Sequence, residues 1–299
     1  GKRLVSELIK KYKPSSILCL VWSKDNPRER QGRNFLKKIG VQLRKVDLLD
    51  KKSLADLPQH PRLIFHLAAT TDTAQADFSC NDFGTRNLVE ALAPNEATHF
   101  VFTGTCAMYC GRETCQKPLD EKLRPAPSNK YGRSKFYAEK ILESEMKSRK
   151  FLLTILRPPT VYGANPRDNS LFDFMKKLII KGSPLSRLNW PGLTSLVWVD
   201  DMAKVIIWSV KHQPSPGKTH SFVVSTESLT LAEISHLMHE RLGKEYREID
   251  LPKWLWKLAA STRGLIFASE RFLPSQIYNL IWRASLVVDD VLYCDAKKL

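Results

Sequence analysis

The sequence of 299 residues has no apolar run long enough to span a bilayer and no signal-peptide pattern at its start. It is also poor in cysteine, and the spacing of its cysteines matches neither a disulfide framework nor a known set of metal ligands. The six lie at positions 19, 80, 106, 110, 115 and 294. We therefore expect a cytoplasmic protein with reduced thiols, no transmembrane helix and no bound metal.

Clusters of basic residues are also missing, although basic residues are in excess. The chain holds 47 lysines and arginines against 31 aspartates and glutamates, a net charge of +16, yet no run of five basic residues occurs. A concentrated basic stretch would indicate a nucleic-acid partner. We expect no specific nucleic-acid binding, and a basic surface that attracts an anionic cofactor.

Short apolar segments alternate with helical ones along the first half of the chain. Residues 2–12 have helical periodicity. Apolar segments typical of strands then occur at 16–22, 41–47, 63–69, 99–105 and 151–157, with helices predicted at 84–92 and from 131 onward. The alternation predicts an α/β fold, a doubly wound parallel Rossmann sheet with a smaller C-terminal lobe. Ligands of such sheets bind beyond the carboxyl ends of the strands.

Tyr131 and Lys135 lie four residues apart in a segment that Asn129 or Ser128 can cap as a helix, so they would share one helical face. A phenol titrates near about 10, and a neighbouring ammonium favours the phenolate. The pair is therefore suited to exchange a proton at a carbonyl or an alcohol. The same spacing is also common on surface helices without any function.

Seven further segments, in the order in which they occur, resemble blocks of a known enzyme family. They are residues 1–5, 46–48, 66–69, 81–88, 103–109, 156–163 and 197–203. With the Tyr131–Lys135 pair, they resemble extended short-chain dehydrogenases/reductases of the NAD-dependent epimerase/dehydratase group. The resemblance extends from residue 1 to about residue 242.

The resemblance implies that Thr105, Tyr131 and Lys135 form a catalytic set. Tyr131 would pass a proton to or from the substrate oxygen while hydride moves at a nicotinamide. Lys135 would lower the pKa of the tyrosine and hold the nicotinamide ribose, and Thr105 would orient the reacting oxygen. Asn81 would either support a proton relay or cap a helix.

The resemblance also implies a bound dinucleotide. In this family an acidic residue after the second strand accepts the ribose hydroxyls of NAD. Here that acid is displaced, and Ser23, Lys24 and Arg28 could hold the 2′-phosphate of NADP instead. We expect NADP or NAD, with a slight preference for NADP. The other expected cofactor contacts, besides Tyr131 and Lys135, are Gly1, Asp47, Leu48, His66, Leu67, Ala68, Ala69, Thr103, Pro158 and Val161.

The family's first strand and the first two glycines of its phosphate-binding loop have no counterpart before Gly1. We expect the chain to lack roughly ten residues of that unit. Residues 1–163 would form the dinucleotide-binding domain, to which residues 195–225 return. Residues 164–299 would form mainly the substrate lobe.

The substrate class is less well defined by the sequence. Nucleotide-sugar enzymes of this family place an arginine just before the block at 197–203; none stands at 192–196, although Arg187 lies earlier. We expect a fairly apolar alcohol or ketone, as in sterol dehydrogenases and flavonol-type reductases. A nucleotide-sugar epimerase or dehydratase and a non-catalytic dinucleotide sensor are the alternatives.

An aromatic and basic region extends from Trp254 to Trp282. It would form a helical core, an apolar substrate pocket or a face that contacts a membrane surface. As partners we expect a small-molecule substrate, a homodimer as the family resemblance allows, and peripheral contact with a membrane.

Overall fold

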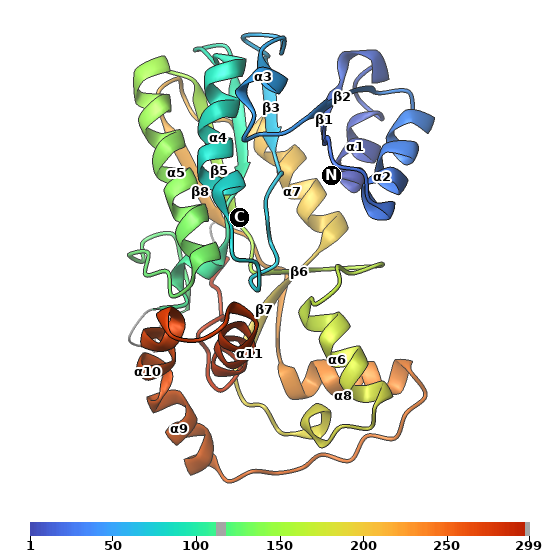
Figure 1. The fold of residues 1–299 in the computed structure, drawn as a ribbon, viewed down its shortest axis with the longest axis vertical. Helices are drawn as coiled ribbons and strands as arrows, with labels where there is room; N and C mark the ends of the chain where they lie inside the picture. The colour runs from blue at the N-terminus through green and yellow to red at the C-terminus, as the bar shows by residue number, and fades with distance from the viewer. Residues whose placement is uncertain (112–117, 297–299) are drawn as a thin grey trace.

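The computed structural model describes residues 1–111 and 118–296, and Figure 1 shows them as two lobes stacked along the long axis. The strands are β1 Leu18–Trp22, β2 Gln42–Val46, β3 Leu63–His66, β4 His99–Thr103, β5 Leu152–Arg157, β6 Thr160–Tyr162, β7 Leu193–Trp198, β8 Thr219–Val223 and β9 Glu227–Thr230. The α-helices are α1 Lys2–Leu8, α2 Pro27–Lys38, α3 Lys51–Leu54, α4 Ser79–Leu92, α5 Lys130–Arg149, α6 Leu171–Ile180, α7 Val199–Lys211, α8 Leu231–Arg241, α9 Lys253–Ser261, α10 Arg263–Ala268 and α11 Ser275–Ser285. Short 3-10 helices, η1 to η4, lie at Pro14–Ser16, Cys106–Tyr109, Pro184–Arg187 and Ser269–Arg271. None of the helices in the described ranges is long and apolar enough to cross a membrane.

The upper lobe confirms the predicted α/β class with parallel strands. Its main sheet has the order β3-β4-β5-β8, and every neighbouring pair in it is parallel. Helices α4 and α5 pack together over one face of this sheet (Figure 1), and β4 and β5 carry apolar side chains that are buried. This is the composition expected of parallel strands that are covered on both faces.

The single predicted sheet is divided. Strands β1 and β2 pair in parallel as a separate two-stranded sheet, and β1 has no hydrogen-bonded partner on the side of β3 in the part of the chain that the structure describes. The apolar residues of β1 are only partly buried, and Trp22 at its end is exposed. Figure 1 shows this pair set apart from the main sheet.

Two helices differ from the sequence-based expectation: one was not predicted, and one begins earlier than predicted. The basic segment after β1, for which no helix was predicted, forms α2; the side chain of Asn26 caps it by accepting a hydrogen bond from the Glu29 amide at 2.9 Å, and Pro27 occupies its first position. Helix α4 begins at Ser79, five residues before the predicted start. Gly84 therefore lies inside the helix, where a Cβ atom would approach the Cβ of Leu48 to 2.9 Å.

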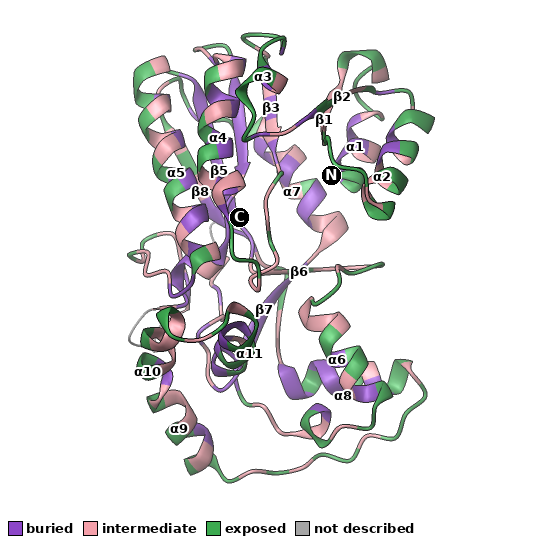
Figure 2. Ribbon diagram, viewed as in Figure 1, coloured by how far each residue is buried: buried purple, intermediate pink, exposed green. Residues whose placement is uncertain are grey.

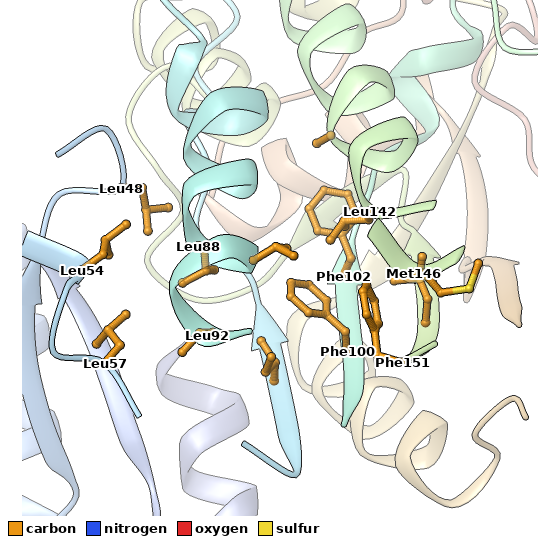
Figure 3. Close-up of a cluster of buried hydrophobic side chains, with 14 of the residues drawn as sticks. Leu48, Leu54, Leu57, Leu88, Leu92, Phe100, Phe102, Leu142, Met146 and Phe151 are labelled. Atoms are coloured by element: carbon orange, nitrogen blue, oxygen red, sulfur yellow. The ribbon is translucent and has the colours of Figure 1, made fainter. Parts of the chain in front are cut away.

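One apolar cluster joins the main sheet to α4 and α5. Figure 3 shows Phe100 and Phe102 of β4 meeting Leu142 and Met146 of α5, with the leucines of α4 on the other side. Figure 2 shows the same interior as buried ribbon surrounded by exposed helix faces. This packing holds α5 in a fixed position relative to the carboxyl ends of the strands, because interiors of this density allow little displacement.

The lower lobe is built on a second sheet of order β6-β7-β9, in which β7 and β9 are antiparallel. Of residues 195–225, predicted to return to the dinucleotide-binding domain, residues 195–198 lie in β7 of this second sheet, whereas β8 joins the main sheet beside β5. Helix α11 reaches back to the upper lobe: the Tyr278 hydroxyl donates to the Ser128 carbonyl at 2.7 Å, and the Trp282 indole donates to the Ser128 hydroxyl at 2.9 Å. Both bonds end beside the first residue of α5.

Candidate functional site

The first turn of α5 packs closely against η2, and two residues allow this: Asn129, which caps α5, and Gly132, which has no side chain. Asn129 caps α5 by accepting a hydrogen bond from the Gly132 amide at 2.7 Å, which is one of the two predicted caps. A Cβ atom on Gly132 would lie 2.8 Å from the carbonyl oxygen of Ala107 in η2. Only glycine permits so close an approach of the two segments. The approach brings Tyr131 to Thr105, the residue that precedes η2.

Thr105 and Tyr131 lie close together, near enough for the Thr105 hydroxyl to influence the pKa of Tyr131. Thr105 is buried and also caps η2, since its hydroxyl accepts from the Ala107 amide at 3.1 Å. Burial raises the pKa of the Tyr131 phenol; the Thr105 hydroxyl and the charge of Arg167 oppose that rise. These two groups, rather than Lys135, are the main influences favouring the phenolate. The expected effect of Lys135 on Tyr131 stays a prediction.

Lys135 lies one turn further along α5 and is only 2% exposed. Its ammonium stands 4.0 Å from the centre of the Phe102 ring. Burial lowers the pKa of Lys135 to about 7, while the charge of Glu139 acts in the opposite direction. Lys135 can therefore gain or lose a proton near neutral pH.

Glu139, a further turn along the same helix face, forms a buried ion pair with Arg157 at the end of β5. The Arg157 Nη2 to Glu139 Oε2 distance is 2.8 Å, and Arg157 also donates to the Tyr109 hydroxyl at 2.9 Å. Gly104 leaves space for this pair, because a Cβ atom there would lie 2.4 Å from Glu139 Oε1. The pair joins α5, β5 and η2 directly behind Thr105.

Asn81 does not cap a helix, which corrects one of its two predicted roles. Helix α4 begins at Ser79, so Asn81 is inside it, and it is 1% exposed. Its side chain accepts from the Thr70 amide at 2.7 Å, donates to the Thr70 carbonyl at 3.0 Å and donates to the Ser134 hydroxyl at 2.9 Å. Asn81 thus joins the loop after β3 to α5 beside Lys135.

The residues expected to hold a dinucleotide mostly follow the carboxyl ends of the parallel strands, but the side chains of several of them are engaged within the protein. His66 is buried and bonded to the Thr85 hydroxyl at 2.8 Å, and burial together with the charge of Lys135 lowers its pKa to about 3. The side chain of His66 therefore anchors β3 on α4 as a neutral ring. The carbonyl of Leu48 accepts from the Asn87 side chain at 2.8 Å, and the Asp47 carboxylate accepts from the Leu49 amide at 3.0 Å.

Thr103 gives the clearest sign that a ligand or a water fits at the carboxyl end of β4. Its hydroxyl oxygen is buried at the end of β4 and has no hydrogen-bond partner among the described residues. Buried hydroxyls are nearly always bonded, so a ligand or water is expected there. Of the other predicted contacts, Leu67, Ala68 and Ala69 follow β3, while Pro158 and Val161 follow β5; Gly1 precedes α1.

The three residues expected at a 2′-phosphate lie after β1. Ser23, Lys24 and Arg28 are all exposed, and Lys24 stands 5.1 Å from the Trp22 ring centre. Arg28 is close enough to Arg167 for the two charges to influence each other. The 23–28 segment thus brings a basic side chain, Arg28, near Arg167.

Two arginines that the sequence reasoning missed lie near each other, and one of them, Arg167, is close enough to influence the pKa of Tyr131. Arg167 pairs with Asp72 only at 3.8 Å, too far for a hydrogen bond, and its buried Nη1 has no hydrogen-bond partner among the described residues. Arg283 of α11 donates to the Asn169 carbonyl at 2.5 Å and to the Thr73 hydroxyl at 3.0 Å. Burial lowers the pKa of each arginine, and Arg167 contributes to lowering that of Arg283. In the sequence, the only indication that either arginine belongs to the site was the position of Arg167, shortly after the family-like block at residues 156–163.

Other predicted candidates lie elsewhere. Arg187 ends η3, which packs on α6 and α8 in the lower lobe. Cys115 lies outside the described residues. Within residues 1–111 and 118–296, no three His, Cys, Asp or Glu side chains are arranged to hold a metal ion.

Replacing the buried lysine gives a pH-dependent test of this geometry. The pKa of Lys135 is lowered from 10.5 to about 7, so between these values the unfolded chain binds more protons and the native protein gains stability as the pH rises. Lys135→Met should therefore raise the midpoint of thermal unfolding most below about pH 7, and less at about pH 9. Differential scanning fluorimetry below about pH 7 and at about pH 9 measures the change in the unfolding midpoint.

Lys140→Met is the matched control, because Lys140 is exposed on the same helix and pairs with Glu143. Its effect should be small and similar at both pH values. An equal shift by Lys135→Met at the two pH values, or a loss of stability at the lower one, would show that Lys135 is not a buried, readily deprotonated amine.

Comparison with known proteins places this arrangement in a family. The UDP-glucose 4-epimerase of Mycoplasma genitalium is 29% identical over 169 residues, which cover 53% of this chain and 49% of that protein. Human dTDP-D-glucose 4,6-dehydratase is 24% identical over 206 residues, or 64% of this chain and 56% of that protein. The matched segment thus spans about half the length of these relatives. A crystal structure of UDP-glucuronic acid 4-epimerase from Bacillus cereus, with UDP-glucuronic acid and NAD, superposes with a TM-score of 0.68 at 19% identity, covering 84% of this chain and 82% of the other.

At that identity the structural likeness shows the fold alone. The family assignment comes from the sequence model of the NAD-dependent epimerase/dehydratase family, which matches residues 1–225. That range includes the Thr105–Tyr131 contact, Lys135, Asn81 and the edge of the main sheet. The chain therefore belongs to the NAD-dependent epimerase/dehydratase family.

Proposed function

We propose that the protein binds a nicotinamide dinucleotide and catalyses hydride transfer at a carbon bearing a hydroxyl or a carbonyl group of a small, anionic substrate. The observation that carries the proposal is the proximity of Thr105 to Tyr131, with the buried Lys135 one helical turn away. A dinucleotide sensor has no need of such a set. The net charge of +16 is the one feature that favours the sensor.

The chain's own residues would divide the work as follows. Tyr131 holds the proton that leaves or joins the substrate oxygen, and Thr105 fixes that oxygen by a hydrogen bond. Lys135 can hold or release a proton close to neutral pH. Thr103, Asp47 and Lys135 would hold the nicotinamide dinucleotide, which when bound supplies the hydride acceptor and donor. A cytoplasmic location accompanies the proposal.

The substrate class follows from Arg167. A guanidinium with a buried nitrogen that has no hydrogen-bond partner is costly, and an anion that accepts from it removes that cost. Arg283 adds a second positive charge near Arg167, and Arg167 is close enough to influence the pKa of the proton-transferring Tyr131. This pair favours the nucleotide-sugar alternative over the apolar alcohol or ketone expected from the missing arginine before residue 197. The named activities of the relatives, epimerisation and dehydration of nucleotide sugars, agree with an anionic substrate.

The choice of dinucleotide stays a proposal. The family is NAD-dependent, and the Bacillus cereus relative was crystallised with NAD. Exposed Lys24 and Arg28 would favour NADP, because a 2′-phosphate offers them a charged partner. Asp25, the acid nearest the end of β1, is paired with Arg30 and Arg33 instead.

A homodimer is also proposed. Phe83 of α4 and Tyr137 of α5 are 61% and 53% exposed on neighbouring helices and line the same surface depression. Two such faces would bury apolar area against each other. Sedimentation velocity of the wild type against Phe83→Glu would detect the association.

Tyr131→Phe is the direct test of the proton-transfer assignment. The substitution removes one hydroxyl, so the fold and dinucleotide binding should persist while turnover falls by ~10²–10⁴-fold. Product formation is followed by chromatography with UDP- and dTDP-sugars, since an epimerase shows no net change in NADH, and by NAD(P)H absorbance with ketones. Tyr137→Phe on the same helix is the control and should keep full activity; equal activity of both variants would refute the assignment.

Arg167→Gln tests the substrate class. Loss of charge-assisted hydrogen bonds worth about 1.5–3 kcal/mol should weaken binding of a nucleotide sugar by about 10–100-fold. Isothermal titration in the presence of dinucleotide measures this, with Arg187→Gln as the control. If apolar ketones bind the wild type and nucleotide sugars do not, the apolar substrate is correct.

A third experiment addresses the gap between β1 and β3. Joining a short strand that ends in a glycine-rich loop ahead of Gly1 should give both strands a hydrogen-bonded neighbour and supply amides for a pyrophosphate. Affinity for NAD, measured by calorimetry, should rise. An extension of equal length with alanines in place of the glycines is the control. Tight binding of NAD(P) by the 299-residue chain, without gain from the extension, would contradict this reasoning.

A further inference from the structure

Exposed apolar side chains concentrate on the last three helices. Of the 17 large hydrophobic residues that are exposed in the described chain, seven lie between residues 254 and 281. They are Trp254, Leu258, Leu265, Phe272, Ile277, Leu280 and Ile281, and we call them the outer apolar face. The exposed fractions reach 75% for Leu265, 72% for Phe272 and 63% for Trp254. Leaving so many large apolar groups in water is unfavourable unless another surface covers them.

These residues are not the inner side of the helices. The buried side is already satisfied: Trp256 packs on Trp190 at a ring distance of 5.0 Å, and Tyr278 and Trp282 bond to Ser128. On α9, Trp254 and Leu258 share one helical face, as Ile277 and Ile281 do on α11. Each helix thus has one apolar face for the core and a second that the fold does not use.

Basic residues surround this second face. Lys253, Lys257 and Arg271 are exposed next to its apolar members, and the Arg271 guanidinium lies 4.5 Å from the Phe272 ring centre. Glu270 is the single acidic residue between positions 252 and 288. Its carboxylate is engaged by Arg133, at 2.5 Å, and by the Lys130 amide, so it does not offset those three charges.

Figure 1 shows α9, α10 and α11 along one side of the lower lobe, with α10 and α11 below α5, and α10 contacts both α9 and α11. Tryptophan and phenylalanine beside lysine and arginine, on short helices that cannot cross a bilayer, are typical of segments that lie in a membrane interface. The charge selects the lipid, since anionic headgroups attract basic residues at a membrane surface by about 1 kcal/mol each.

We propose that α9, α10 and α11 dock the protein on the surface of an anionic lipid bilayer. The outer apolar face enters the boundary between headgroups and acyl chains, while Lys253, Lys257 and Arg271 contact lipid phosphates. The proposal does not depend on the proposed reaction.

Vesicle co-sedimentation of the full chain tests the docking. Wild type should sediment with vesicles of mixed phosphatidylcholine and phosphatidylserine, less with phosphatidylcholine alone, and less at high salt. The triple variant Trp254→Ser/Leu265→Ser/Phe272→Ser should bind at least about tenfold more weakly, because it loses three apolar insertions. The control Ile180→Ser/Leu185→Ser/Leu237→Ser removes three other exposed apolar groups, 49–59% exposed, from the α6–α8 region and should bind as wild type does.

Circular dichroism and thermal unfolding check that each variant folds. If the triple variant does not fold, the single variant Leu265→Ser, at the most exposed position, is used in its place. Lys253→Glu/Lys257→Glu/Arg271→Glu should abolish the preference for the anionic vesicles. Absence of vesicle binding by the wild type, or equal loss in the control triple variant, overturns the proposal. So does a wild-type oligomer that the outer-face variant converts to monomer without any vesicle binding, since a second copy would then cover the face.

Discussion

No side chain separates the first turn of α5 from the Ala107 carbonyl, because Gly132 occupies the point of contact. The rest of the site depends on this approach. Tyr131 precedes the glycine and meets Thr105, which precedes η2, so one backbone contact sets the distance between two side chains from separate elements. The cap at Asn129 and the bonds from Tyr278 and Trp282 to Ser128 fix where α5 begins. The lower lobe therefore takes part in placing Tyr131.

Behind this contact the helix carries two charged groups in the interior. Lys135 and Glu139 follow Tyr131 at successive turns, and both are buried. An isolated buried charge costs several kcal/mol, yet Glu139 has Arg157 as a partner, whereas Lys135 has a phenylalanine ring and a pKa of about 7. The ion pair makes the helix rigid at the level of β5, while the unpaired lysine keeps a proton that is easily moved. One turn of α5 thus carries Glu139, which is paired with Arg157, and the preceding turn carries Lys135, which can exchange a proton.

The sequence predicted the fold class and the segments that converge, since alternation and helical spacing are local patterns. Asn129, one of the two caps that it offered, does cap α5, and Tyr131 and Lys135 both lie on that helix. Helix α2 was missed although its signals are local, a cap at Asn26 followed by Pro27 in a polar segment. Asn81 was open to a capping role because the helix was predicted to start at residue 84; it begins at Ser79, and the bonds of Asn81 to Thr70 join separate segments that no local pattern relates. Arg167 and Arg283 lie 116 positions apart and carry no shared motif, so only the folded chain shows that they lie near each other and that Arg167 lies near Tyr131.

Helix α11 connects the candidate site at the start of α5 with the outer apolar face. One side of it presents Tyr278 and Trp282 to Ser128 and directs Arg283 to Thr73 beside the site; the other presents Ile277, Leu280 and Ile281 to the surroundings. A force on the outer side acts on a helix that is bonded directly to the start of α5. Because the inner side is held by hydrogen bonds rather than by apolar contact alone, a shift of α11 would break specific bonds at Ser128. The outer side of α11 and the hydrogen bonds to Ser128, the residue before the Asn129 cap of α5, thus belong to one 11-residue helix.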